Sequence, residues 1–265
     1  MANLPPLPRK RLGQHFLIDP NLLRKIVSLA EIQPSDSVCE IGPGGGALTG
    51  LLCQAAKQVV ALEVDPRMVE FLKTEFAGYA NLDVQEQDAL RYSFEDLPEH
   101  TIVVANLPYN ISTPIMFRLL EAQQKISRMV LTIQLEVAQR LVAKPSTKDY
   151  GVLSVMVQHL AEVKFGFKVS RKCFRPVPDV DSGVVRLDIR QDHQEGLVDL
   201  AKFQRTVRAA FGQRRKTLMN ALRSVGIPDE CLHQVQQDTG ISLARRAETL
   251  SVQEFRNLSG AMPPL

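Results

Sequence analysis

The sequence predicts an α/β fold built around a parallel sheet, followed by a small all-helical domain. Between about residues 20 and 190, short β-branched apolar runs alternate with amphipathic segments of helical length. Several glycines gather where the first of these runs ends, which is typical of a strand that feeds a helix. Beyond about residue 190 the strand signals stop. We therefore divide the chain into an α/β domain of residues 1–190 and a helical domain of residues 191–265.

The apolar runs place seven strands and several helices. The strands are expected at residues 37–41, 58–63, 82–85, 102–106, 129–134, 163–169 and 184–189. Residues 47–56 have apolar side chains at helical spacing, and Asp65 followed by Pro66 is typical of a helix cap and a first helical residue. Beyond residue 190, glycines separate amphipathic segments near 200–211, 214–223, 228–237 and 251–258.

The composition excludes several classes of protein. Hydrophobic residues make up 45% of the 265 residues and charged residues 23%, which indicates a well-packed globular chain. No apolar run approaches the roughly 18 residues of a membrane span, and the N-terminal residues lack the apolar core of a signal peptide. We expect a cytoplasmic protein. Its four cysteines are scattered without a CxxC pair, so we expect neither a metal site nor disulfides.

The charge is unevenly distributed along the chain. The net charge is only +3, but the segment from Lys202 to Arg223 holds seven basic residues and no acidic one. Two further acid-free stretches, 164–175 and 9–11, are also basic. One such run alone is typical of a solvated surface, whereas three together favour a polyanionic partner.

The first strand ends in EIGPGGG, where Gly42 and Gly44 allow the backbone to approach a ligand closely. Nicotinamide, flavin and S-adenosylmethionine proteins share such a turn, and a tight strand-to-helix turn without a ligand is the alternative. Glu63 ends the second strand, where a carboxylate can accept hydrogen bonds from ribose hydroxyls. Asp65 is more simply a helix cap. Asp88, after the third strand, is placed to accept a hydrogen bond from a cofactor's adenine amine, unless it is an ordinary loop aspartate.

The fourth strand ends in Asn106-Leu107-Pro108-Tyr109, at the edge of the sheet where doubly wound folds place their chemistry. An adenine amine is a poor nucleophile because its lone pair is delocalised into the ring. The Asn106 side-chain oxygen and the Leu107 carbonyl, which Pro108 biases to an extended conformation, would draw the amine towards tetrahedral geometry. Tyr109 would stack on the base. Catalysis would be mainly alignment and electrostatics, without a strong general base. A plain strand end with a turn is the alternative.

Eight segments together resemble the ribosomal RNA adenine dimethyltransferase family, in its bacterial small-subunit branch, along nearly the full length. They are RLGQHFLIDP, EIGPGGGALT, ALEVD, QDAL, NLPYNIST, CFRPVPDVDS, FGQRRKTLMNAL and RAETLSV. The resemblance implies a Rossmann-like S-adenosylmethionine-dependent methyltransferase domain over 1–190 and a helical RNA-binding domain over 191–265. It implies that two adjacent adenosines in a 3′-terminal hairpin loop of small-subunit (16S) ribosomal RNA become dimethyladenosines, late in assembly of the immature small subunit. We expect a monomer.

The resemblance also assigns site residues. Around S-adenosylmethionine it places His15, Leu17, Gly42, Glu63, Asp88 and Asn106. Many relatives have asparagine at the position of His15, which leaves the protonation state of His15 open. Phe174 resembles an aromatic wall for the target base, although it could equally be a core residue. The RNA-facing residues would be Arg208, Arg214, Arg215, Lys216 and Arg223, whose spacing suits phosphate contacts.

Three competing functions remain in view. A nicotinamide-dependent oxidoreductase would share the glycine turn and Glu63 but has no use for the Asn106–Tyr109 motif. An assembly factor with a vestigial site would bind ribosomal subunits without turnover. The related large-subunit enzyme that confers macrolide resistance shares the catalytic domain, and only the resemblance of FGQRRKTLMNAL and CFRPVPDVDS favours the small-subunit branch.

Overall fold

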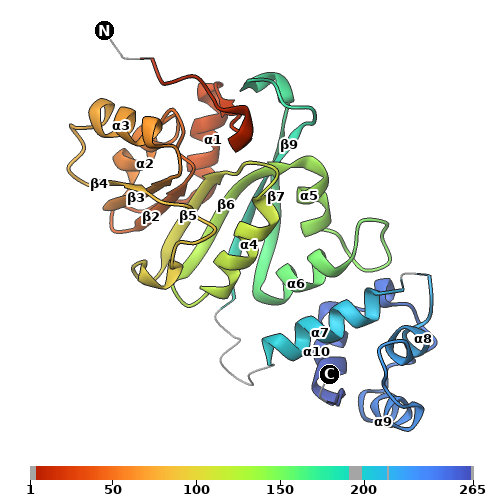
Figure 1. Ribbon diagram of the computed structural model, residues 1–265. Coiled ribbons are helices and arrows are strands. Elements are labelled where there is room, and N and C mark those ends of the chain that lie inside the picture. Colours follow the sequence, from red (N-terminus) through yellow and green to blue (C-terminus); the bar gives the residue numbers. More distant parts are fainter. Residues whose placement is uncertain (1–3, 191–198, 214, 264–265) are drawn as a thin grey trace. The chain divides into compact units, whose positions relative to one another are not determined.

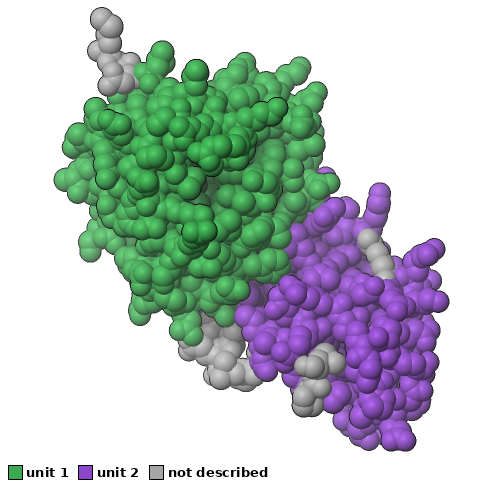
Figure 2. Space-filling model, viewed as in Figure 1, with its two compact units in different colours: residues 1–138, 163–189 green, residues 139–162, 190–265 purple. Residues whose placement is uncertain are grey.

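The computed structural model describes residues 4–190, 199–213 and 215–263. These residues form two compact units, shown separately coloured in Figure 2. Unit 1 comprises residues 1–138 and 163–189, and unit 2 comprises residues 139–162 and 190–265. Residues 139–162, which lie within the first domain predicted from the sequence, thus group with the C-terminal helices. The division of the chain into functional domains at residue 190 stays a prediction.

Unit 1 is built on a seven-stranded sheet in the order β4-β3-β2-β5-β6-β9-β7 (Figure 1). All seven predicted strands are present, two with the predicted bounds and five longer by one to three residues. They are β2 (Ser37–Ile41), β3 (Gln58–Glu63), β4 (Leu82–Glu86), β5 (Thr101–Asn106), β6 (Ile126–Gln134), β7 (Ala161–Val169) and β9 (Ser182–Ile189). The pairs from β4 to β6 are parallel.

The β9 strand departs from the parallel sheet that the sequence predicts. It runs antiparallel to β6, with Gln134 opposite Ser182 and Arg128 opposite Asp188. Residues 170–181, which connect β7 to β9, contain only a 3₁₀ turn (Arg171–Cys173) and the two-residue strand β8 (Phe174–Arg175). A connection this short cannot include the crossover helix that a parallel neighbour of β7 would need. The sheet is therefore mixed.

A small second sheet joins the N-terminal segment to this connection. The β1 strand (Phe16–Leu17) pairs antiparallel with β8, with Phe16 opposite Arg175 and Leu17 opposite Phe174. Two-residue strands have no periodicity that a sequence could reveal, so this sheet was not predicted. It fixes residues 12–17, which follow the 3₁₀ turn Lys10–Leu12, near the edge of the main sheet where the candidate site lies.

Up to residue 141 the described chain forms five α-helices, and aspartate side chains cap two of them. They are α1 (Pro20–Ala30), α2 (Thr49–Ala55), α3 (Pro66–Glu75), α4 (Ser112–Glu121) and α5 (Leu135–Leu141). The Asp19 side chain accepts the backbone N–H of Asn21 at 2.9 Å and starts α1. The Asp65 side chain accepts the backbone N–H of Arg67 and starts α3, so the predicted helix cap is confirmed.

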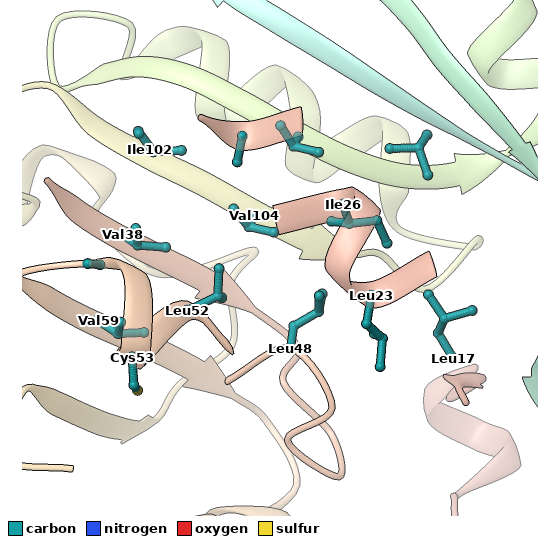
Figure 3. Packing of buried hydrophobic residues seen from close by; sticks show 14 of the residues in the cluster. Leu17, Leu23, Ile26, Val38, Leu48, Leu52, Cys53, Val59, Ile102 and Val104 are labelled. Carbon is teal, nitrogen blue, oxygen red and sulfur yellow. The ribbon is translucent and has the colours of Figure 1, made fainter. Parts of the chain in front are cut away.

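The core of unit 1 lies on both faces of the sheet. On one face, Ile26 of α1 and Leu52 of α2 are fully buried in one cluster with Val38 and Val104 (Figure 3). On the other face, Val103 of β5 and its partner Met129 of β6 are equally buried. Strands that are covered on both faces have continuous runs of apolar residues. This pattern is why their positions could be predicted from the sequence.

Unit 2 consists of helices. They are α6 (Val152–Leu160), α7 (Leu200–Phe211), α8 (Leu218–Arg223), α9 (Asp229–Thr239) and α10 (Val252–Ala261), with a 3₁₀ turn at Ala247–Thr249. The predicted segment 214–223 begins too early, because the Thr217 side chain accepts the N–H of Asn220 and starts α8 at Leu218. Phe203 and Phe255 are fully buried, and Phe211 stacks on Phe255 with ring centroids 5.6 Å apart. No helix among the described residues has the length and hydrophobicity of a membrane span.

Candidate active site

A cleft lies at the carboxyl ends of β2, β3, β4 and β5, the edge at which open α/β sheets bind ligands. Its empty space is about 710 Å³, counting the solvent at its mouth. Nine predicted site residues line it: His15, Gly42, Gly44, Glu63, Asp88, Asn106, Leu107, Pro108 and Tyr109. Residues that are up to 94 positions apart in the chain, from His15 to Tyr109, therefore meet at one cleft.

The glycine turn forms one wall of the cleft and is open to it. Gly42 has a φ of +67°, and a Cβ atom built on it would meet no atom within 4 Å. Gly44 has a φ of +53°, and a Cβ there would lie 2.6 Å from the Phe16 ring. Both positions thus favour glycine for their backbone. The open space in front of Gly42 fits a ligand that contacts the backbone.

Glu63 is buried beside this turn. One carboxylate oxygen accepts the N–H of Gly44 at 3.0 Å and the other accepts the N–H of Asp65 at 2.9 Å. Burial raises the pKa of Glu63, and these two hydrogen bonds oppose that shift. Each carboxylate oxygen can accept a second hydrogen bond, so the predicted ribose contact remains available.

Asp65 has a different set of partners. The Arg67 guanidinium hydrogen-bonds its carboxylate at 2.6 Å, Arg9 lies 3.4 Å away, and the pKa of Asp65 is lowered, chiefly by Arg67. The helix cap and the two arginines thus engage this carboxylate, in agreement with the preference for Glu63 as the ribose ligand.

Asp88 follows β4 in a turn that it stabilises itself. One carboxylate oxygen accepts the N–H of Leu90 at 2.9 Å, while the other lies 3.9 Å from the Arg91 side chain. The Asp88 side chain is 41% exposed. The second oxygen, with only this distant exposed cation beside it, is the atom that could accept a cofactor amine.

The Asn106 side chain is held in one orientation. Its amide nitrogen donates to the carbonyl of His15 at 2.9 Å, a contact between residues 91 positions apart. A carbonyl only accepts hydrogen bonds, so this contact assigns which amide atom is nitrogen and which is oxygen. Among the described residues no group donates to the Asn106 side-chain oxygen, which leaves it as an unused acceptor at the cleft.

The Leu107 carbonyl is a second unused acceptor. The Leu107 N–H donates to Thr132 of β6 at 3.1 Å and fixes the backbone at the strand end. The next two carbonyls are occupied, that of Pro108 by the N–H of Ile111 and that of Tyr109 by the Ser112 hydroxyl. Within the described chain no donor reaches the Leu107 carbonyl.

Tyr109 and His15 form a stacked pair, with ring centroids 5.8 Å apart and planes inclined by 22°. The Tyr109 hydroxyl lies 2.7 Å from the buried Ser182 hydroxyl, and burial raises the pKa of Tyr109. The His15 Nδ1 lies 2.8 Å from the carbonyl of Pro176. Because a carbonyl can only accept a hydrogen bond, Nδ1 is the donor in this contact.

Two predicted site residues lie in the core instead of on the cleft. Leu17 is 3% exposed and Phe174 is 0% exposed, and both belong to the apolar cluster beneath α1. Phe174 thus occupies a core position, which was one of the two possibilities that the sequence left open. A contact of Leu17 with the cofactor and of Phe174 with the target base stay predictions.

The sequence did not single out much of the N-terminal wall. Leu12, Gly13, Gln14 and Phe16 line the cleft beside His15. Gly13 has a φ of +62°, and a Cβ there would lie 3.0 Å from the Asn110 side chain. A glycine in RLGQ is a turn signal, but nothing local indicates which segment it will contact. No cluster of metal-ligating side chains occurs in residues 4–190, 199–213 or 215–263.

The predicted RNA-facing residues lie in unit 2. Arg208 on α7 and the pair Arg215 and Lys216 before α8 are exposed. Arg223 forms two hydrogen bonds of 2.7 Å with the Asp229 carboxylate, so its charge is partly neutralised. Arg214 lies outside the described residues.

The fold and the cleft define a class: a Rossmann-like α/β protein with a glycine turn after its first core strand and a buried acidic residue at the end of the second. The family model described as Ribosomal RNA adenine dimethylase matches residues 7–260. The chain belongs to this family.

Curated relatives and solved structures agree with this assignment. The Ribosomal RNA small subunit methyltransferases A of Bacillus cytotoxicus and Geobacillus kaustophilus are 44% and 45% identical, covering 97% of this chain and 91% and 92% of theirs. A dimethyladenosine transferase from Plasmodium falciparum has a TM-score of 0.82 at 29% identity, covering 92% and 95% of the two chains. The 23S rRNA methyltransferase ErmE has a TM-score of 0.73 at 30% identity, covering 93% and 99%.

Proposed function

We propose that this protein transfers methyl groups from S-adenosylmethionine to the exocyclic amine of adenosines in small-subunit ribosomal RNA. The observation that carries the proposal is the pair of unused acceptors, the Asn106 side-chain oxygen and the Leu107 carbonyl, at the strand end that lines the cleft. An amine with two hydrogens matches two acceptors. Both are fixed before substrate binds, so little reorganisation is needed during reaction.

The cleft residues fit S-adenosylmethionine. The open space at Gly42 would take the amino-acid part of the cofactor close to the backbone, Glu63 would accept the ribose hydroxyls and Asp88 the adenine amine. When bound, the cofactor supplies an electrophilic methyl group on a sulfonium ion. His15, whose Nδ1 is bonded to the Pro176 carbonyl, would contact the same ligand from the N-terminal wall.

In this proposal the chain's own residues orient the target amine. In the first transfer Asn106 and Leu107 would each accept one N–H, and in the second transfer one of them would accept the single N–H that remains. These hydrogen bonds draw nitrogen lone-pair density out of the adenine ring. Tyr109, held by His15 and Ser182, would support the base. The amine loses its proton only after it has gained a methyl group, so water can remove that proton and a strong base is unnecessary.

The substrate follows from the relatives. The curated relatives are small-subunit methyltransferases at 44–45% identity, whereas the large-subunit enzyme ErmE is 30% identical. We therefore propose two adjacent adenosines of a 3′-terminal hairpin loop in 16S ribosomal RNA as targets, each dimethylated. The partner would be the immature small subunit, bound by a cytoplasmic monomer. Arg208, Arg214, Arg215, Lys216 and Arg223 would contact its phosphates.

The test is methyl transfer by the purified chain to small ribosomal subunits that lack these methyl groups, read by mass spectrometry of the digested RNA. We expect dimethyladenosine at two adjacent positions. Asn106→Ala should lower the turnover rate by roughly 100-fold or more, the effect of losing one preorganised polar group. The matched control is Asn110→Ala, an exposed residue of the same loop, which should keep most of the activity.

Other outcomes have definite meanings. Tight binding to subunits without any transfer would support an assembly factor in place of an enzyme. Preferential transfer to large-subunit RNA would support the macrolide-resistance branch. Equal activity of the Asn106 and Asn110 variants would contradict the role given to the Asn106 acceptor.

A further inference from the structure

Unit 2 contains a groove that the proposed chemistry does not use. It lies between the C-terminal half of α7 and the turn that joins α8 to α9, and its empty space is about 1370 Å³, counting solvent at its mouth. Its residues are Arg205, Arg208, Ala209, Gly212, Gln213, Ser224, Val225, Gly226, Ile227, Pro228, Cys231 and Pro263. It is broader and more open than a pocket for a small metabolite, which suits part of a larger molecule.

One wall of the groove is cationic. Arg205 and Arg208 are three residues apart on α7, so their side chains lie on the same helix face. Both are exposed, and neither forms a hydrogen bond or ion pair with any described residue. No aspartate or glutamate is among the described residues that line the groove. Two unneutralised guanidinium groups without a nearby carboxylate in the lining favour an anionic ligand, and phosphate above all.

The floor of the groove is apolar. Val225 is 49% exposed, an unusual position for a large aliphatic side chain, and it continues into the buried Ile227 and the ring of Pro228. The side chain of Gln213 is exposed at the rim and can both donate and accept hydrogen bonds. Phosphate-binding side chains beside a flat apolar surface match one nucleotide, with its charged backbone at one side and its base or ribose at the other.

We propose that this groove binds a single unstacked nucleotide of ribosomal RNA, with its phosphate on Arg205 and Arg208 and its base against Val225 and Ile227. The inference rests on the proposed function for the choice of RNA. None of the described residues that line the groove is aromatic, so the contact is tolerant of base identity and adds affinity and position instead of sequence choice. It is separate from the cleft, where the target adenosine reacts.

The groove holds its own reporter, the partly exposed thiol of Cys231. The full-length protein would be alkylated with iodoacetamide, alone and with saturating protein-free 16S ribosomal RNA, and the labelling rate at Cys231 read from its peptide by mass spectrometry. We expect RNA to slow the labelling by at least about 10-fold, because a nucleotide in the groove covers the thiol. Unchanged labelling in an RNA complex of demonstrated occupancy would overturn the proposal.

Affinity measurements test the cationic wall and the apolar floor of the groove separately. Changing both arginines, Arg205→Gln with Arg208→Gln, should weaken RNA binding about 10-fold and reduce the slope of log Kd against log salt by about one, because the two arginines neutralise one phosphate. Val225→Asn should weaken binding without changing that slope, since it removes apolar surface from the groove but keeps the charge. The control is Arg246→Gln, an exposed arginine outside the groove, which should change affinity less than 3-fold. Equal effects of the arginine changes and the control would contradict a specific site.

Parallel assays separate this proposal from the proposed function. Methyl transfer without protection of Cys231 would contradict nucleotide binding in the groove and support the proposed enzyme activity. Protection of Cys231 without methyl transfer would support nucleotide binding and contradict the proposed activity. Protection by intact small subunits but not by protein-free RNA would identify a ribosomal protein as the occupant and overturn the proposal. Circular dichroism of each variant shows whether it is folded, which distinguishes a loss of binding from a loss of folding.

Discussion

At the scale of single residues, the cleft depends on atoms that have been left without partners. The Asn106 oxygen is unused because its amide nitrogen is bonded to His15, and the space in front of Gly42 is open because no side chain reaches it. The sequence predicts which residues these are. It does not predict the orientation of the Asn106 amide, which depends on a backbone carbonyl 91 positions away.

Gly42→Ala should weaken cofactor binding more than it destabilises the fold. The added methyl group points into the cleft and also forces alanine into the left-handed region, which costs roughly 1–2 kcal/mol. Gly240→Ala is the matched control, because its φ of +68° is close to the +67° of Gly42 and its Cβ would also meet nothing within 4 Å. By calorimetric titration we expect the Kd for S-adenosylmethionine to rise at least about 10-fold in the first variant and to stay unchanged in the second. Similar Kd values in both would argue against a ligand at Gly42.

At the scale of elements, the sequence predicts what periodicity and caps can determine. The strands contain apolar residues that are continuous in β5 (TIVVAN) and interrupted by polar residues in β7 (AEVKFGFKV), and the α3 cap follows from Asp65-Pro66. The predicted strands and the predicted cap are confirmed. Two features were missed because they depend on distant partners: the antiparallel direction of β9 and the pairing of β1 with β8. For Phe174 the sequence left a ligand-facing wall and a core position equally open, and the residue is buried. An aromatic residue shortly before two prolines has the same local sequence whether its side chain faces a ligand or the core.

The link between β2 and α2 should make stability depend on pH. Glu40, at the end of β2, is 2% exposed and accepts the Thr49 hydroxyl of α2 at 2.7 Å. Burial raises the pKa of Glu40 from 4.5 to about 8. The unfolded chain therefore loses this proton first, and between pH 4.5 and about 8 the folded state holds more protons than the unfolded state. The free energy of unfolding should fall as pH rises through this window.

Glu40→Gln removes the titrating group and keeps an oxygen for Thr49 to bond. Urea unfolding at pH 5, 6.5 and 8 should show a smaller loss of stability with pH in this variant than in the wild type, with the two curves separating by roughly 1–3 kcal/mol at pH 8. Parallel curves for the two proteins across the window would mean that Glu40 does not titrate there.

At the scale of the whole molecule, ligand binding should report which cofactor the fold accepts. S-adenosylmethionine at about 100 times its Kd stabilises the folded state by about 2.7 kcal/mol, enough to raise the Tm of the transition that destroys the cleft by roughly 5–10 °C. Differential scanning fluorimetry should show this shift with S-adenosylmethionine and less than about 1 °C with NAD. A comparable shift with NAD would favour the oxidoreductase instead, and Gly42→Ala serves as the control in which the shift is reduced.

The order of strands in the sheet has a consequence for how the protein is made. The last strand to be synthesised, β9, does not add to an edge but lies between β6 and β7, both of which leave the ribosome earlier. Until residues 182–189 emerge, the growing chain presents β6 with an open edge that could pair with another nascent chain. The Ser182 hydroxyl that holds Tyr109 arrives with the same segment. The sheet and the active site are thus completed together, when translation of the α/β unit is almost finished.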